Sequence, residues 1–347
     1  MAFAYGTRVV HTKREIAIIL QCAKGFFDKR HMKEDTTVET KRYPLAVVIP
    51  TFNRAGVLME CLQHLERQSC KDFEVVVVDD GSTDSTRDQM KSYLRDTPLA
   101  IRYLRQENHG PARARNHAIS LVEAPIVLMI GDDIFVSAGL VADHLKLHLN
   151  RPEQSVAGLG LTRWSEVGQT VTPFMKWLDS DGLQFDYGSL LRGKKPDWGN
   201  FWTSNISLKT RVLKEFPFDE SFPHAAMEDI ELACRIETRH GLEMVFLPEA
   251  LAHHFHPTTF VQACRRMVKV GESTAYFDQL WPGKRRITRN VLKRPLQSIL
   301  LAFPRAVPIW VKLADWSLNL VCPNSLMRYV LSCHFEIGYD RRRQGAP

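Results

Sequence analysis

The sequence has seven cysteines in 347 residues, but no two of them are spaced as a CxxC pair. Because structural zinc sites usually show such pairs, we expect no zinc site of that kind. Dispersed single thiols are typical of a reducing compartment, so we expect a cytoplasmic protein with free cysteines. No GxGxxG sequence follows any predicted strand, which argues against a dinucleotide-binding oxidoreductase.

Long apolar runs are also missing. A membrane-spanning helix needs roughly 20 consecutive apolar residues. The nearest candidate, residues 295–321, is interrupted by Arg305, Lys312 and Asp315. The first 30 residues contain the charged run "KRE" at 13–15, so we do not expect a signal peptide there.

The charge balance is positive. The formal net charge is +7 and the pI is about 9.0, while 44% of the residues are hydrophobic and 24% are charged. These proportions are ordinary for a globular protein. The excess of positive charge favours a negatively charged partner, such as a phosphorylated ligand, an anionic lipid surface or nucleic acid.

Short apolar segments alternate with amphipathic ones from residue 45 onward. Residues 45–50, 73–80, 101–106 and 126–131 have the apolar, largely β-branched pattern of buried strands. Residues 56–68, 82–94 and 111–122 have helical patterns, the last opened by a proline that suits a first helical turn. This alternation predicts an α/β fold with a mostly parallel central sheet and helices on both faces.

Two pairs of carboxylates follow predicted strands. Asp79 and Asp80 come after the second strand, and Asp132 and Asp133 come after the fourth. Ligands of such sheets bind at the carboxyl ends of the strands, so all four should face one crevice. Neighbouring buried carboxylates raise each other's pKa unless a cation compensates them, and a divalent metal is the natural cation. Turn and helix-cap chemistry is the alternative for both pairs.

Four segments together resemble the family-two glycosyltransferases of GT-A fold. They are "VVIPTFNRAGVLMECLQHLERQSCKDFEVVVVDDGSTDST", "NHGPARARNHAIS", "IVLMIGDD" and "FPFDESFPHAAMEDIELACRIETRHG", and they follow the family's order and spacing. The resemblance covers about residues 45–275. It implies a nucleoside-diphosphate sugar donor, usually UDP-linked, a Mn²⁺ or Mg²⁺ ion, and inversion at the anomeric carbon. It divides the chain into a helical N-terminal extension (1–43), a GT-A catalytic domain (44–275) and a basic helical C-terminal region (276–347).

The resemblance also assigns the nucleotide-binding residues. Asp80 would accept a hydrogen bond from uracil N3, Asp79 would support its loop, and Arg115 would face the diphosphate. The residues that would line the nucleotide pocket are those after the first strand: Pro50, Thr51 and Asn53, with Arg54 nearby.

The metal ligands are expected in two places. Asp132 and Asp133 match the family's aspartate motif, with Asp133 the direct ligand, although Gly131 stands where many members have a further acidic residue. His254 and His256 are two positions apart, so on a strand they point to one face, and imidazole suits Mn²⁺-like ions. A single histidine here would more often be structural.

The acceptor side is expected around residues 198–232. The pair Glu228 and Asp229 opens a predicted helix and matches the family's acidic pair, with Asp229 as general base and Glu228 orienting it or the acceptor. A plain helix start is the alternative. Trp202 and Asn205 are candidate contacts to the donor or acceptor sugar. A core position is the alternative for the tryptophan.

The C-terminal region is basic and contains Trp310 and Trp316. A solvated basic face and a helix on an anionic membrane surface are both consistent with this mixture. We therefore expect an enzyme that transfers a sugar to a glycan or lipid-linked glycan, peripheral at the inner face of the cytoplasmic membrane, with no nucleic acid partner. The alternatives are a non-catalytic nucleotide-sugar-binding or scaffold protein and, lower in rank, a sugar nucleotidyltransferase.

Overall fold

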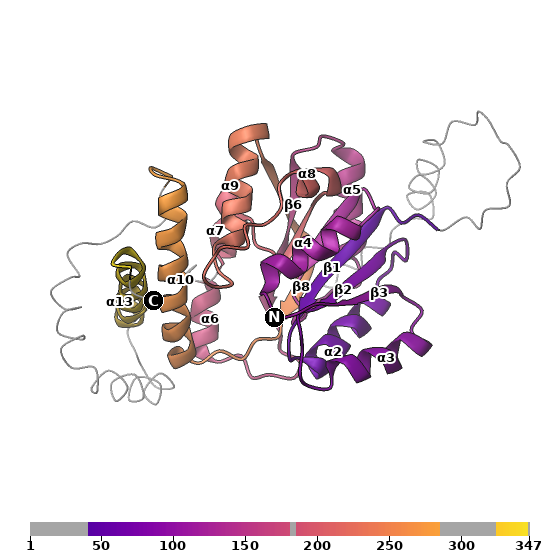
Figure 1. The fold of residues 1–347 in the computed structure, drawn as a ribbon, viewed down its shortest axis with the longest axis horizontal. Coiled ribbons are helices and arrows are strands. Elements are labelled where there is room, and N and C mark those ends of the chain that lie inside the picture. The colour runs from indigo at the N-terminus through magenta and orange to yellow at the C-terminus, as the bar shows by residue number, and fades with distance from the viewer. Residues whose placement is uncertain (1–40, 181–184, 285–323, 346–347) are drawn as a thin grey trace, which may run out of the picture. The chain divides into compact units, whose positions relative to one another are not determined.

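A computed structural model describes residues 41–180, 185–284 and 324–345. The expected N-terminal helical extension falls almost entirely outside these residues, as do Trp310, Trp316 and all but the first residue of the basic cluster at 284–294. From Arg42 onward the described residues form one compact unit (Figure 1).

The first half of the unit contains the expected alternation of strands and helices. The strands β1 (Leu45–Thr51), β2 (Glu74–Asp79), β3 (Ala100–Arg105) and β4 (Ile126–Ile130) are parallel, in the order β3-β2-β1-β4. The helices α2 (Ala55–Glu66), α3 (Thr86–Asp96) and α4 (Pro111–Leu121) connect them. Each parallel pair needs such a crossover, and Pro111 is the first residue of α4 as expected.

The second half extends the same sheet. β5 (Ile134–Val136), β6 (Val156–Trp164), β7 (Asn205–Lys209) and β8 (Glu243–His254) complete the order β3-β2-β1-β4-β7-β6-β8-β5. β7 is antiparallel to β4 and β6, and β5 is antiparallel to β8. Because β6 and β8 are parallel to each other, six of the eight described strands run the same way. The predicted mostly parallel α/β fold is confirmed.

Two hydrophobic layers cover the sheet, because successive strand residues point to opposite faces. Leu45, Val47 and Ile49 of β1 pack with α2 and with α5 (Leu140–Asn150). Ala46 and Val48 pack in the layer that contains α4 and α9 (Glu228–His240). Figure 1 shows α2 and α3 together beside β1–β3, with α4 on the other side of these strands. A strand buried on both faces reads as a continuous apolar run, which is why β1 and β2 lack an alternating pattern.

The remaining helices gather around the second half. They are α6 (Pro173–Ser180), α7 (Tyr187–Leu191), α8 (Thr210–Glu215), α10 (Phe260–Leu280) and α13 (Asn324–Arg343). A short 3₁₀ helix spans Trp198–Asn200. Among the residues that the structure describes, no helix has the length and apolar content needed to cross a membrane.

α10 and α13 pack against each other, as Figure 1 shows. Leu331, Phe335 and Tyr339 of α13 are buried, and the Tyr339 hydroxyl donates to Asp278 Oδ2 of α10 at 2.7 Å. The expected boundary between residues 275 and 276 therefore falls inside one continuous helix, α10. In this part of the C-terminal region the chain packs on the preceding residues, and membrane contact by the region stays a prediction.

Candidate active site

Asp79 supports the loop after β2 in the structure, and its part in nucleotide binding stays a prediction. It is fully buried at the end of β2, and its carboxylate accepts three hydrogen bonds. The donors are the backbone N–H of Ser82 at 2.7 Å, the Tyr103 hydroxyl at 2.6 Å and Arg105 Nη1 at 3.0 Å. These bonds join the loop after β2 to the neighbouring strand β3.

Asp80 holds the loop that leads into α4. Its Oδ1 accepts from Gln106 Nε2 at 2.8 Å and from the backbone N–H of His109 at 3.0 Å. Its Oδ2 accepts from the backbone N–H of Gly110 at 2.7 Å. Only 4% of the residue is exposed. The contact with uracil stays a prediction, and it needs a carboxylate lone pair that these three hydrogen bonds leave free.

Asn53 connects the end of β1 to the loop after β2. Its φ of 52° is left-handed, a conformation that asparagine tolerates better than most residues. Its Oδ1 accepts from the backbone N–H groups of Thr83 at 2.7 Å and Asp84 at 3.3 Å, and its own N–H donates to Ser82 Oγ. The half-buried Pro50 lies at the same strand end. These residues thus form one edge, as the sequence predicts, and contact with a nucleotide is untested.

A cation lies between Asp132 and Asp133, and it is an arginine. Arg54 Nη1 lies 3.0 Å from Asp132 Oδ1 and 2.6 Å from Asp133 Oδ2. The Thr51 hydroxyl donates to Asp132 Oδ2 at 2.7 Å. Burial and the neighbouring Asp133 raise the pKa of Asp132 to about 6, although Arg54 and Thr51 act in the opposite direction.

Asp133 also meets the two predicted histidines. His254 Nε2 lies 3.3 Å and His256 Nδ1 3.5 Å from Asp133 Oδ2. One ligand atom from each of the three residues lies within 4.8 Å of the others. Burial raises the pKa of Asp133, but His254, His256 and Arg54 outweigh it and hold the pKa well below the usual range. One carboxylate and two imidazoles are a donor set that fits a Mn²⁺-like ion.

A side chain at position 131 would press against the Asp133 carboxylate. A Cβ at this position would lie 2.6 Å from Asp133 Oδ1, closer than real Cβ contacts. The Asp133 carboxylate thus occupies the space that the acidic side chain found in many family members would need.

Trp164 stacks on the predicted metal ligand His254, with ring centroids 5.3 Å apart and planes at 8°. This contact fixes the orientation of the imidazole.

The acidic pair opens α9. Met227, immediately before it, has a φ of 72°, an uncommon conformation for a non-glycine residue. The half-buried Asp229 accepts from the backbone N–H of Ile230 at 2.8 Å and of Thr203 at 3.4 Å. Burial raises the pKa of Asp229, against Arg115 and the two N–H groups. Burial and Asp229 together raise the pKa of Glu228 to about 7.

Arg115 contacts this acidic pair. Its Nη1 lies 3.5 Å from Glu228 Oε1, its guanidinium stacks over Phe218 at 5.6 Å, and only 7% of the residue is exposed. The structure thus gives Arg115 a carboxylate partner that the sequence did not predict. Its contact with a diphosphate stays a prediction.

Two expected sugar contacts lie in the protein interior. Asn205 is fully buried; its amide nitrogen donates to Ala250 O at 2.8 Å and to Leu161 O at 3.3 Å, and its Oδ1 faces His144 Nε2 at 3.0 Å. Both ends of the amide are engaged, so in this structure Asn205 joins strands and leaves no group for a sugar. The period-2 strand pattern alone could not show this, because β7 is covered on both faces.

Trp202 occupies a core position, the alternative noted from the sequence. It is 9% exposed and packs against Phe185 and Tyr187, with ring centroids 5.1 Å and 4.8 Å away. The ring is therefore part of the hydrophobic core, and little of it is accessible to a sugar.

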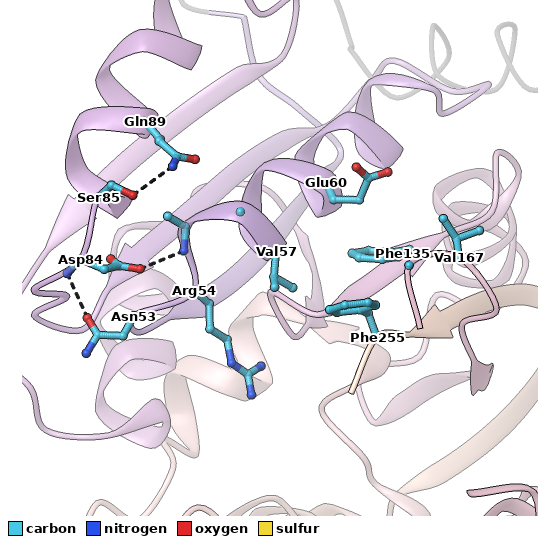
Figure 2. Close-up of a pocket in the computed structure, with 13 residues that line it drawn as sticks. Asn53, Arg54, Val57, Glu60, Asp84, Ser85, Gln89, Phe135, Val167 and Phe255 are labelled. Atoms are coloured by element: carbon cyan, nitrogen blue, oxygen red, sulfur yellow. Dashed lines mark hydrogen bonds between the residues drawn. The ribbon is translucent and has the colours of Figure 1, made fainter. Parts of the chain in front are cut away.

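A cavity of about 630 Å³ opens beside the site, and most of its lining residues were not predicted from the sequence (Figure 2). Its walls come from the starts of α2 and α3 and from the region of Phe135 and Phe255, whose rings stack 5.6 Å apart. Arg54 lines the same cavity. The position of Phe255 between two predicted metal ligands was the one available clue.

Comparison with known proteins identifies the family. The model of the glycosyl transferase family 2 domain matches residues 46–222, more than half of the chain. The chain belongs to glycosyltransferase family 2. The expected resemblance is confirmed, and the sugar nucleotidyltransferase alternative is set aside. The matched range of this family 2 chain includes Asp80 and Asp133 but ends before Asp229 and His254, whose placement rests on the structure.

Curated relatives of this family 2 chain include two bacterial proteins. The validoxylamine A glucosyltransferase of Streptomyces hygroscopicus subsp. jinggangensis is 31% identical over 268 residues, which cover 65% of this chain and 60% of the relative. An uncharacterized glycosyltransferase of Bacillus subtilis is 27% identical over 275 residues, covering 67% of this chain and 69% of that protein. The chain thus matches about three fifths of the length of the first relative.

A solved structure shares the fold. The mannosyltransferase of Pyrobaculum calidifontis, in complex with GDP-Man and Mn²⁺, superposes with a TM-score of 0.58 at 18% identity, covering 94% of this chain and 95% of that one. At this identity the likeness shows the fold alone, and it agrees with the GT-A architecture expected of a family 2 member.

Proposed function

We propose that this chain is an inverting, metal-dependent glycosyltransferase. It transfers a sugar from a nucleoside-diphosphate sugar, UDP-linked, to a hydroxyl of a glycan or lipid-linked glycan in polysaccharide or glycoconjugate biosynthesis. The observation that carries the proposal is the cluster of Asp133, His254 and His256 at the edge where the strands end, in a family 2 chain. The relationship to a validoxylamine A glucosyltransferase supports sugar transfer.

The donor occupies the edge formed by Asn53, Asp80 and the loop before α4. Asp133, His254 and His256 would hold a Mn²⁺ or Mg²⁺ ion, which would supply positive charge to neutralise the departing diphosphate. His254 and His256 hold the pKa of the Asp133 carboxylate well below its usual range, so this carboxylate is ionised.

Asp229 acts as the general base. The acceptor hydroxyl transfers its proton to the Asp229 carboxylate as its oxygen attacks the anomeric carbon, and the nucleoside diphosphate leaves from the opposite side. Two backbone N–H groups, of Ile230 and Thr203, orient this carboxylate. Burial raises its pKa, which makes it a stronger base when ionised. The positive charge of Arg115, which also lies 3.5 Å from Glu228 Oε1, acts against this rise and favours the ionised form of Asp229.

The decisive experiment measures binding and turnover separately. UDP- and GDP-sugars are screened with Mn²⁺ or Mg²⁺ for protection against thermal unfolding, and the best donor is then tested for metal-dependent hydrolysis and transfer. Wild type is compared with Asp133→Asn and with Asp88→Asn, whose carboxylate is exposed on α3. Binding without any turnover would favour a non-catalytic sugar-nucleotide-binding protein. No binding of any donor would contradict the proposal.

The place of action is proposed as the inner face of the cytoplasmic membrane. The exposed Arg341, Arg342 and Arg343 end α13 and supply positive charge for an anionic surface. Co-sedimentation of the full chain with anionic and with neutral vesicles, at low and high salt, tests this. Equal binding to both kinds of vesicle, or to neither, would contradict it.

A further inference from the structure

Arg54 lies at the start of α2 and reaches into the carboxylate pair. The residue immediately precedes the helix, and its backbone carbonyl accepts the N–H of Leu58 at 2.9 Å. About 38% of its side chain is exposed, because it also borders the cavity in Figure 2. Burial lowers the pKa of the guanidinium, but Asp132 and Asp133 raise it by more, so the group keeps its charge.

The carboxylate oxygens of Asp132 and Asp133 have different hydrogen-bond partners. Asp132 uses Oδ2 for the Thr51 hydroxyl and Oδ1 for Arg54. Asp133 Oδ2 is the oxygen that faces His254 and His256, and it is also the oxygen nearest to Arg54, at 2.6 Å. The atom that completes the metal-ligand cluster is therefore already hydrogen-bonded to a fixed positive charge.

A divalent ion at this cluster meets two effects of Arg54. It must share or take over the lone pairs of Asp133 Oδ2, and it is repelled by a guanidinium within a few ångströms. In the metal-free protein the same guanidinium is favourable, because two adjacent buried carboxylates without a counter-charge repel each other. Arg54 thus stabilises the metal-free protein and destabilises the metal-bound protein.

We infer that Arg54 is a built-in counter-ion of the Asp132–Asp133 pair that stabilises the metal-free protein and weakens divalent-metal binding at Asp133, His254 and His256. The inference rests on the metal site of the proposed function. It makes Arg54 a residue that sets metal affinity, whereas the resemblance placed it only near the nucleotide. The free protein then binds the ion weakly, and the negative diphosphate of a donor, which can take the guanidinium, strengthens ion binding.

The test measures Mn²⁺ binding to the full chain without nucleotide, by the electron paramagnetic resonance signal of free Mn²⁺. Arg54→Gln removes the charge and should tighten Mn²⁺ binding by about tenfold, a screened value for a half-exposed charge. Arg54→Lys keeps the charge and should stay near wild type. Arg87→Gln removes one exposed charge from the neighbouring helix α3 and serves as the matched control.

Thermal unfolding supplies a second readout. Metal-free Arg54→Gln should melt below wild type, and Mn²⁺ should raise its melting temperature by more than it raises that of wild type. Arg54→Met, which keeps the apolar stem, replaces Arg54→Gln if the latter does not fold. Unchanged or weaker Mn²⁺ binding in the neutral variant would overturn the inference while leaving the metal site intact.

Asp133→Asn separates this failure from failure of the proposed function. Mn²⁺ binding that disappears in Asp133→Asn places the ion at the cluster, so the comparison of Arg54 variants is valid. Mn²⁺ binding that is the same in wild type and Asp133→Asn would overturn both the metal site and the role of Arg54.

Discussion

Replacing Gly338 by alanine should detach or displace the C-terminal helix α13. Gly338 is buried where α13 crosses α10, and a Cβ there would fall on the backbone carbonyl of Val268, well inside van der Waals contact. Gly271 of α10 lies against the backbone of Phe335 and Tyr339 in the same way. The clashing atoms belong to the main chain, so no side-chain rotation relieves the contact, and the two helices must separate.

The cost can be estimated from the packing. Overpacking a core by one methyl group typically costs about 1–3 kcal/mol, and a main-chain clash belongs at the upper end, about 3 kcal/mol. Separation also exposes part of Leu331, Phe335 and Tyr339, each of which is at most 4% exposed. Urea unfolding followed by circular dichroism measures the difference in unfolding free energy from wild type.

Gly56→Ala is the matched control. Gly56 also lies in a helix, α2, but a Cβ there meets nothing within 4 Å, so alanine should be neutral or stabilising by up to about 1 kcal/mol. Mn²⁺ binding should persist in Gly338→Ala, because Asp133 and His254 belong to other elements. An unfolding free energy of Gly338→Ala equal to wild type would refute the described crossing of α10 and α13.

Three further predictions concern the site and its support. Asp229→Asn should keep donor affinity but lower transfer about 10²–10⁴-fold, the usual effect of a positioned base; loss of donor affinity in titrations would make it a donor-site residue instead. Gly131→Ala should push the Asp133 carboxylate aside and weaken Mn²⁺ binding, and unchanged binding by calorimetry would refute this. Burial lowers the pKa of His144 to about 4, so between pH 6.5 and 4 the unfolded chain binds a proton that the folded chain does not. The advantage of wild type over His144→Gln in urea unfolding should therefore shrink by about 2 kcal/mol from pH 8 to pH 5; a constant difference would contradict it.

The local sequence was sufficient to predict those elements whose burial pattern can be read within a few neighbouring residues. Apolar runs located β1, β2, β3 and β4 because a strand buried on both faces must be apolar throughout. Topology then required the carboxylates after β2 and β4 to share one edge.

The partners of the candidate site residues depended on contacts far apart in sequence. Thr51 and Asp132 are 81 positions apart, and Asp133 and His254 are 121 apart. Asn205 looks like a polar residue in a loop-to-strand segment, yet the antiparallel insertion of β7 between β4 and β6 buries it completely. No short pattern carries that information, because burial on both faces depends on which strands pair.

The sequence by itself determined the fold class, the family and the residue types of a metal site, since each follows from periodicity or from motifs read within a few dozen residues. Only the tertiary structure decided that Arg54 lies between Asp132 and Asp133 and that Arg115 pairs with Glu228. A long, flexible side chain such as arginine can reach many carboxylates from one backbone position. Which one it reaches depends on how the completed sheet and its helices place those carboxylates in space.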